Sequence, residues 1–197
     1  MIVSREEGER RLRPYLSGLA RAIHAGDQGL DDIMGDQKHR VKSRSISSTR
    51  NDLIIHEARR IFDGDPTVRF ESRHGRDIMY IKDDAIILFK KLDRSRRTRN
   101  APTQLALKLF GQQPLDEMPL ETPRFVAGWQ MDMLGMAIQV MMITYPKAHG
   151  VEWVIPLDDY GAATKAVPIT PPPIDGPGPQ VRKKAGGDAD AQTASSG

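Results

Sequence analysis

The chain contains no cysteine among its 197 residues, which excludes disulfides, thiol nucleophiles and cysteine-based zinc ribbons. Its first segment is charged from Arg5 onward and has no apolar run of the kind found in signal peptides. The longest apolar stretch, residues 133–145, is interrupted by Gly135 and Gln139 and is shorter than the ~20 residues that a membrane-spanning helix needs. These absences predict a cytoplasmic protein that makes no membrane contact.

Sequence motifs for cofactors and metals are also missing. There is no Gly-rich phosphate loop and no nucleophile elbow. None of the five histidines pairs with another at metal-ligand spacing. His56-Glu57 begins like the helix of a zinc protease, but Arg60 occupies the position of the second histidine. We therefore expect no metal site and no cofactor.

Apolar residues at three- and four-residue steps predict a helix near the start of the chain. Ser4 followed by Glu7 has the form of a capping box. Pro14 lies within the apolar stripe, where proline interrupts helical hydrogen bonding, so we expect the helix to begin near Arg13. Gly26 is expected to end it. The apolar positions of this helix are Leu12, Leu16, Leu19, Ala20 and Ile23.

The next segment, residues 29–48, is polar, basic and rich in serine, which predicts a mobile connector or a weak helix. Thr49 and Asp52 have the spacing of an N-cap and its partner, so a second helix is expected to begin at Thr49 and to end before Gly64. Its buried residues are predicted to be Ile54, Ala58 and Ile61, flanked by Ile55 and Phe62.

From residue 67 onward, short apolar segments alternate with turn-forming residues, which predicts β-strands in two groups of three. The segments are 68–73, 78–81 and 85–92, then 124–133, 136–145 and 151–157. Turn signals at 74–75, 83–84, 134–135 and 149–150 predict antiparallel neighbours within each group. A short helix is expected at residues 101–110. The predicted core includes Phe70, Tyr80, Ile87, Phe89, Phe125, Trp129, Ile138 and Trp153.

These elements predict an α+β fold, with a mainly antiparallel sheet of about six strands and two or three helices on one face. Three regions are expected along the chain. Residues 1–48 form an N-terminal helix and a basic connector, and residues 49–160 form the α+β core domain. Residues 161–197 form a Pro/Gly-rich tail that is predicted to be disordered, because it has too little apolar surface to repay the entropy of ordering.

Clustered positive charge is the main functional signal in the sequence. One basic stretch covers residues 38–50 and contains no acid between Lys38 and Arg50. A second stretch, residues 90–99, follows a predicted strand and has a single acid, Asp93. A loop of this kind presents guanidinium groups to phosphates. The candidate nucleic-acid-binding residues are Lys90, Lys91, Arg94, Arg96, Arg97 and Arg99. The alternative is a solvated loop whose arginines pair with Asp116, Glu117 and Glu121.

An enzymatic alternative uses the acids of the same region. In a nuclease of the restriction-enzyme type, a helical acid and an acid at a strand end hold a metal, and a lysine orients the attacking water. Here those acids would be drawn from Glu57, Asp77, Asp83 and Asp84, beside Lys90. The strand that should carry Glu-x-Lys has Leu88 two residues before the lysine, so the motif is degenerate.

A methionine-rich segment offers a further surface. Met131, Met133, Met136, Met141 and Met142, with Trp129 and Trp153, are expected to lie mostly in the core. Any face that stays exposed would contact a partner protein.

One set of residues carries a resemblance to known proteins: Phe89, Lys90, Lys91, Leu92, Arg97, Asn100, Pro102 and Thr103. On these residues, the region from Asn51 to Leu157 resembles a group of small uncharacterised bacterial proteins found beside helix-turn-helix regulators of the XRE type, some of which carry a zinc-peptidase-like domain. It implies a toxin–antitoxin-like or mobile-element setting and a partner regulatory protein, and it supplies no catalytic residues. The sequence thus favours a non-enzymatic interaction or regulatory module with nucleic-acid contact through a basic loop; the alternative is a nucleic-acid-directed enzyme, nuclease-like or toxin-like.

Overall fold

The computed structural model describes residues 2–73, 75–82, 84–98, 108, 110–113, 122–147 and 150–161. The chain divides into two units, residues 1–165 and 166–197, and all of the described residues lie in the first. The chain begins with helix α1 (Arg5–Met34), a 3-10 turn η1 (Gly35–Arg40) and helix α2 (Ser43–Ile61). The strands that follow are β1 (Val68–Arg73), β2 (Arg76–Ile81), β3 (Ala85–Lys91), β4 (Arg124–Met131), β5 (Ile138–Lys147) and β6 (Gly150–Pro156).

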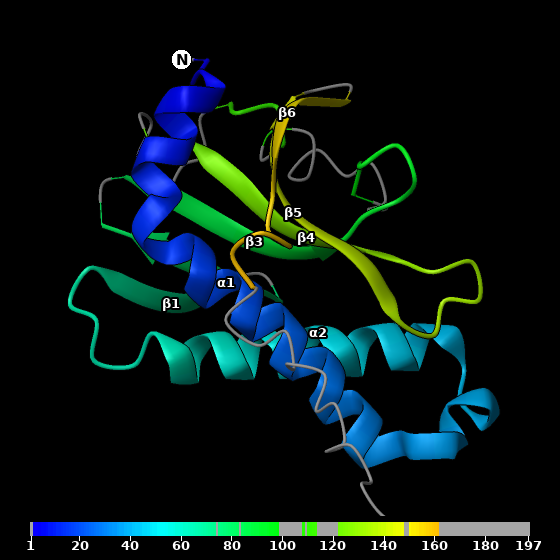
Figure 1. Cartoon of the computed structure of the whole chain (residues 1–197). Helices are drawn as coiled ribbons and strands as arrows, with labels where there is room; N and C mark the ends of the chain where they lie inside the picture. Colours follow the sequence, from blue (N-terminus) through cyan, green and yellow to red (C-terminus); the bar gives the residue numbers. More distant parts are fainter. Residues whose placement is uncertain are drawn as a thin grey trace, which may run out of the picture. The chain divides into compact units, whose positions relative to one another are not determined.

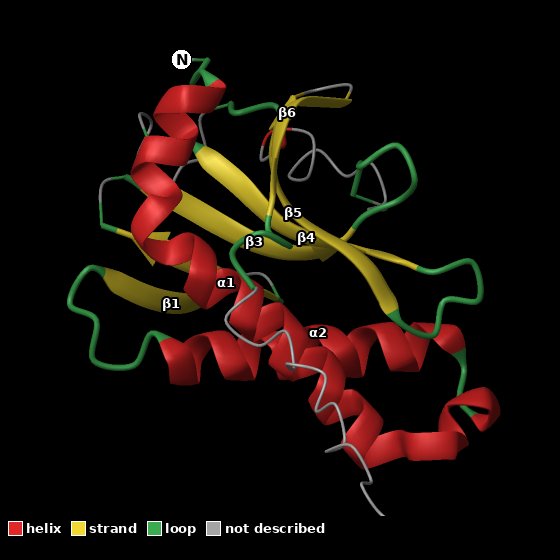
Figure 2. Ribbon diagram, in the orientation of Figure 1, coloured by secondary structure: helices red, strands yellow, loops and turns green. Residues whose placement is uncertain are grey.

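The strands form one six-stranded sheet whose order in space is their order along the chain. Every neighbouring pair is antiparallel except β3 and β4, which run parallel with Ile86 opposite Arg124. Connections of two to six residues join the antiparallel neighbours, whereas a parallel pair needs a long crossover, here residues 92–123. The predicted α+β class and mainly antiparallel sheet are therefore confirmed (Figures 1 and 2).

Both α-helices pack on the same face of the sheet (Figure 1). Leu12, Leu16, Leu19 and Ile23 of α1 are fully buried and belong to one core cluster with residues of α2 and the strands. Burying each such side chain is worth about 1.5–3 kcal/mol. Of the predicted core residues, five are buried and three are half-buried against this cluster. These are Tyr80, Ile87, Phe89, Phe125 and Trp129, and Phe70, Ile138 and Trp153 respectively.

The predicted start of α1 near Arg13 is wrong, because the helix begins at Arg5 and continues through Pro14. Ser4 is its N-cap, and its hydroxyl accepts a hydrogen bond from the Glu7 backbone N–H at 3.2 Å, which is one half of the predicted capping box. The Glu7 carboxylate accepts hydrogen bonds from Arg10 and Arg11. A proline inside a helix costs about 3 kcal/mol. Burial of the leucines on either side of Pro14 exceeds that cost, so tertiary packing keeps the helix intact.

Gly26 does not end α1 as predicted, because α2 crosses the helix there. A Cβ atom on Gly26 would lie 2.5 Å from the Cα of Ile54, closer than any side chain allows. The helix runs on to Met34, and Gly35 occupies the C-cap with a φ of 45°. Glycine at residue 26 therefore serves the close approach of two helices.

Of the two alternatives predicted for residues 29–48, the helix is right and the mobile connector is wrong, because α1, η1 and α2 occupy almost all of this segment. Helix α2 begins at Ser43, so Thr49 lies within the helix and is not its N-cap. Two buried residues explain the early start: Ile46 packs inside, and Arg50 forms a buried ion pair with Asp27. The predicted helix at 101–110 falls mostly outside the described residues, as do residues 162–197 of the predicted disordered tail.

The opposite face of the sheet is buried as well. Ile78, Tyr80, Ile86, Leu88 and Val126 form a second cluster there, with Phe110 packed against it. Arg124 lies on this face with 1% exposure, and its Nη1 donates to the Gln113 carbonyl at 2.7 Å. Burial lowers the pKa of its guanidinium. Residues 110–113 thus cover part of the face that α1 and α2 leave open.

Candidate phosphate-binding groove

The predicted basic loop is a closed turn that follows β3. The backbone N–H of Asp93 donates to the Arg97 carbonyl at 2.8 Å, and the N–H of Arg97 donates to the Asp93 carboxylate at 2.9 Å. Arg96 donates its N–H to the Asp93 carbonyl and has a φ of 64°. This bonding fixes the backbone of residues 93–97. The side chains of Arg94, Arg96 and Arg97 are all exposed.

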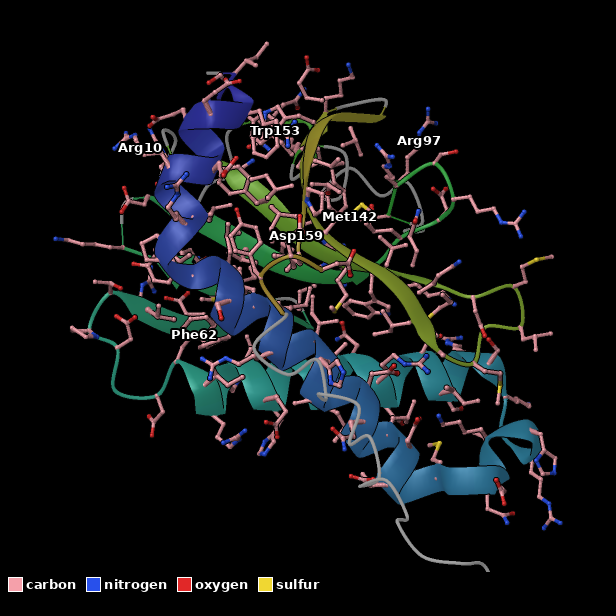
Figure 3. All side chains as sticks on the ribbon, in the orientation of Figure 1. Arg10, Phe62, Arg97, Met142, Trp153 and Asp159 are labelled. Carbon is pink, nitrogen blue, oxygen red and sulfur yellow. The ribbon has the colours of Figure 1, made fainter. Side chains whose placement is uncertain are left out.

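A groove of about 460 Å³ lies beside this turn, and we call it the basic groove. Its lining comes from four parts of the chain: Arg5, residues 95–97, Lys147 and residues 150–154. The charged lining residues are Arg5, Arg96, Arg97, Lys147 and Glu152. Figure 3 shows Arg97 on the loop after β3 and Trp153 near the start of α1. The lining thus combines four cations with one acid.

Each wall of the basic groove is held by specific contacts. The indole N–H of Trp153 donates to the Val3 carbonyl at 2.8 Å, which ties the residue before the α1 cap to β6. The Trp153 ring stacks on Tyr145 with centroids 5.1 Å apart. Lys147 and Glu152 form an ion pair at 2.8 Å. Gly150 lies against the Arg97 guanidinium, since a Cβ atom there would be 3.9 Å from its Nε.

The free charge of the basic groove is positive. Glu152 is already paired with Lys147, and both side chains remain partly exposed. Within the described part of the chain, the guanidinium groups of Arg94, Arg96 and Arg97 have no ion-pair partner. Arginines of this kind are available for bidentate donation to an external oxyanion. The acids proposed to neutralise them, Asp116, Glu117 and Glu121, lie outside the described residues.

The structure separates the six candidate residues of the second basic stretch. Arg96 and Arg97 line the basic groove. Lys91 and Arg94 line a neighbouring pocket of about 830 Å³ together with Asp93 and Asp132, so acids accompany the cations there. Lys90 is half-buried in β3, where desolvation chiefly, with the Arg76 charge second, lowers its pKa. Arg99 lies outside the described residues.

Two cations of the basic groove, Arg5 and Lys147, were missed by the sequence analysis. Arg5 lies 88 residues before the turn and Lys147 lies 50 residues after it, and nothing in their local sequence marks them as partners of Arg97. Only the packing of α1 and the β5–β6 hairpin against one another brings them to the same groove.

The first basic stretch is divided in the same way. Lys38 is buried in an ion pair with Asp31, and Arg50 is buried with Asp27. Arg40, Lys42 and Arg44 are exposed. These three residues supply a set of surface cations outside the basic groove.

The carboxylates of the enzymatic alternative occupy separate places. Glu57 pairs with Arg60 at 2.8 Å, and Asp77 pairs with Arg59 at 2.9 Å. Asp84 follows the turn at the far end of β2, roughly 13 Å along the strand from Asp77 at ~3.3 Å per residue. Asp83 lies outside the described residues. Among the residues that the structure describes, no group of three metal-ligating side chains forms a site.

The methionine-rich segment is split between core and surface. Trp129 and Met142 are buried, while Met133 and Leu134 are 88% and 83% exposed at the tip of the β4–β5 loop. The Asp132 carboxylate accepts a hydrogen bond from the Met136 N–H at 2.7 Å, which closes this loop. The expected partner-facing surface is therefore confined to the loop tip.

Among the described residues, no helix is both long enough and apolar enough to cross a membrane. Comparison of the chain with protein-family models, with curated proteins and with solved structures finds no match.

Proposed function

We propose that this chain is a non-enzymatic interaction module that binds the phosphate backbone of nucleic acid in the basic groove. One observation carries the proposal: Arg5, Arg96, Arg97 and Lys147 surround one groove, and among its described lining residues Glu152 is the only acid. Phosphate oxygens accept charge-assisted hydrogen bonds from guanidinium groups, often in pairs. Sequence-independent affinity for nucleic acid comes mainly from such contacts.

The fixed backbone of the turn supports this proposal. Asp93 donates one hydrogen bond and accepts two, and these three bonds hold residues 93–97 before any ligand arrives. Binding therefore orders only the arginine side chains, at about 0.5–1.5 kcal/mol each, and not the loop itself. A preformed turn of this kind favours recognition of an extended anion.

The test is the salt dependence of binding. With four phosphates engaged, the log–log slope should be about −0.7 to −0.9 per phosphate, so a fourfold rise in salt should weaken binding roughly 50- to 150-fold. The variant R96Q/R97Q/K147Q should lower the steepness of that slope by about 1 for each lost contact. Fluorescence anisotropy of a labelled oligonucleotide measures both.

A matched control variant is available in the exposed cations of the first basic stretch. R40Q/K42Q/R44Q also removes three positive charges, from exposed positions outside the basic groove. It should leave the salt slope unchanged. Equal losses in both variants would mean that net charge, and not the groove, attracts nucleic acid, and the proposal would then be abandoned.

A partner protein is the second part of the proposed function. The exposed side chains of Met133 and Leu134 on a closed loop support it, because large apolar side chains at a rigid tip suit contact with another protein. A regulatory setting of the toxin–antitoxin or mobile-element kind would use both surfaces. Affinity purification from the source cell, after nuclease treatment, should recover a protein with the wild type that M133S/L134S loses.

A further inference from the structure

The basic groove contains apolar side chains among its cations. Val151, Trp153 and Val154 of β6 line it together with Arg97 and Lys147. Phosphates gain nothing from apolar contacts, so these residues are useful only to a ligand that also carries exposed apolar surface. The bases of a duplex are stacked and paired inside the helix, whereas those of a single strand are free to contact protein.

The shape of the groove points the same way. Proteins that bind a duplex usually insert a helix or a β-ribbon into its grooves, so the protein supplies the projecting element. Here the cations line a hollow of about 460 Å³. A positively charged groove with aromatic or apolar walls is the usual arrangement for a single strand.

The walls resist the opening that a duplex would require. Turn 93–97 is closed by its own backbone hydrogen bonds. On the other side, β5 and β6 are paired up to Lys147 and Gly150, and the Trp153–Val3 hydrogen bond fixes this hairpin to the start of α1. These contacts hold both walls of the basic groove in place, so the groove does not widen to admit a duplex.

From these three observations we infer that the basic groove selects single-stranded over double-stranded nucleic acid. The strand's phosphates lie between the arginines of the turn and Lys147, and its sugars or bases contact Val151 and the part of the half-buried Trp153 that lines the groove. The inference rests on the proposed function, since it names the class of nucleic acid that the same groove takes.

Two probes of one sequence test the preference for single strands. One is a labelled strand of about 12 nucleotides, which is within the usual site size of proteins that bind single strands, and the other is the same strand annealed to its complement. Anisotropy at low salt should show the single strand bound at least about tenfold more tightly. Equal or tighter duplex binding would overturn the inference while the proposed function stands. No binding of either probe would overturn the proposed function itself.

A second readout places the strand in the groove. The chain has two tryptophans, and Trp129 is buried with 1% exposure, so W129F leaves Trp153 as the sole source of tryptophan fluorescence. Nucleobases in the groove should quench its fluorescence, and an unchanged emission on saturation would place the strand elsewhere. If W129F folds poorly, the emission of the wild type with and without the strand can be compared instead. The buried Trp129 does not contact the ligand, so the difference comes from Trp153.

The apolar wall is tested by Val151, which belongs to neither core cluster and so tolerates replacement. V151S should weaken the single strand by about threefold and V151L should not, because the apolar contact is removed in one and kept in the other. The salt slope should be the same in both variants, since no charge has changed. Equal affinities for V151S and the wild type would remove the apolar wall from the inference and overturn it.

Discussion

Arg50 and Asp27 form a buried ion pair where α2 crosses α1, with 2.7 Å between the Arg50 Nε and an Asp27 carboxylate oxygen. The same guanidinium donates to the Met136 carbonyl at 2.9 Å, and the second Asp27 oxygen accepts from the Ile138 N–H at 3.3 Å. The pair therefore joins both helices to the β4–β5 hairpin.

Breaking this pair should be costly. Replacing Arg50 with methionine leaves the half-buried Asp27 carboxylate without its cation, and the free energy of unfolding should fall by about 3 kcal/mol, the lower end of the range for a buried pair. The double variant D27N/R50M should lose clearly less, because no unpaired charge remains. Urea denaturation measures both; a double variant as unstable as R50M would refute the ion-pair explanation.

Two glycines of α1 should respond oppositely to alanine. G29A should stabilise the protein by up to about 1 kcal/mol through helix propensity, since the nearest atom to its new Cβ is 4.0 Å away. G26A should be destabilising in spite of the same gain, because its Cβ would meet the Ile54 backbone at 2.5 Å. Thermal unfolding followed by circular dichroism compares them, and a G26A protein as stable as G29A would contradict the close helix crossing.

Glu7 should titrate at unusually low pH. Hydrogen bonds from Arg10, then from Arg11, lower the pKa of its carboxyl to about 2. A lowered folded-state pKa means that its stabilising contribution is present above about pH 4.5 and is lost as the pH falls through about 2. The stability difference between wild type and E7Q should therefore shrink over that interval. Carbon-13 NMR of the Glu7 carboxyl reports its pKa directly, and a value near 4.5 would contradict the bonding.

Two substitutions of Asp93 separate the effect of its charge on nucleic-acid binding from the effect of a preformed turn. D93N removes a negative charge next to the turn but keeps an oxygen that accepts from the Arg97 N–H, so nucleic-acid affinity should hold or rise. D93A removes the same charge together with the acceptor, and the loosened turn should bind more weakly. Should D93A instead bind as tightly as D93N, the hydrogen bond from the Arg97 N–H to the Asp93 side chain would have no part in binding.

The sheet could be predicted from the sequence because its signals are local. Alternation and turn residues place β1, β2, β5 and β6 to within a few positions, and Gly75 and Gly135 adopt the positive φ that such turns need. The helices were less predictable, since the meaning of Pro14 and Gly26 depends on what packs beside them. Sequence alone marks both as helix breakers.

The candidate groove was predictable only in part. Arg96 and Arg97 are prominent because they stand in a basic run. Arg5 and Lys147 reach the same groove through tertiary contacts that no local pattern encodes. Likewise, Lys38 and Arg50 belong to a basic stretch in sequence but are buried in ion pairs in the fold.

The hydrogen bond between Trp153 and Val3 joins residues 150 positions apart, and it has a consequence for synthesis. At 5–20 residues per second, β6 leaves the ribosome roughly 8–30 s after the segment that begins α1. Throughout that time the apolar face of α1 has no β5 or β6 to cover it. A nascent chain of this protein should therefore engage a chaperone at α1 until β6 emerges.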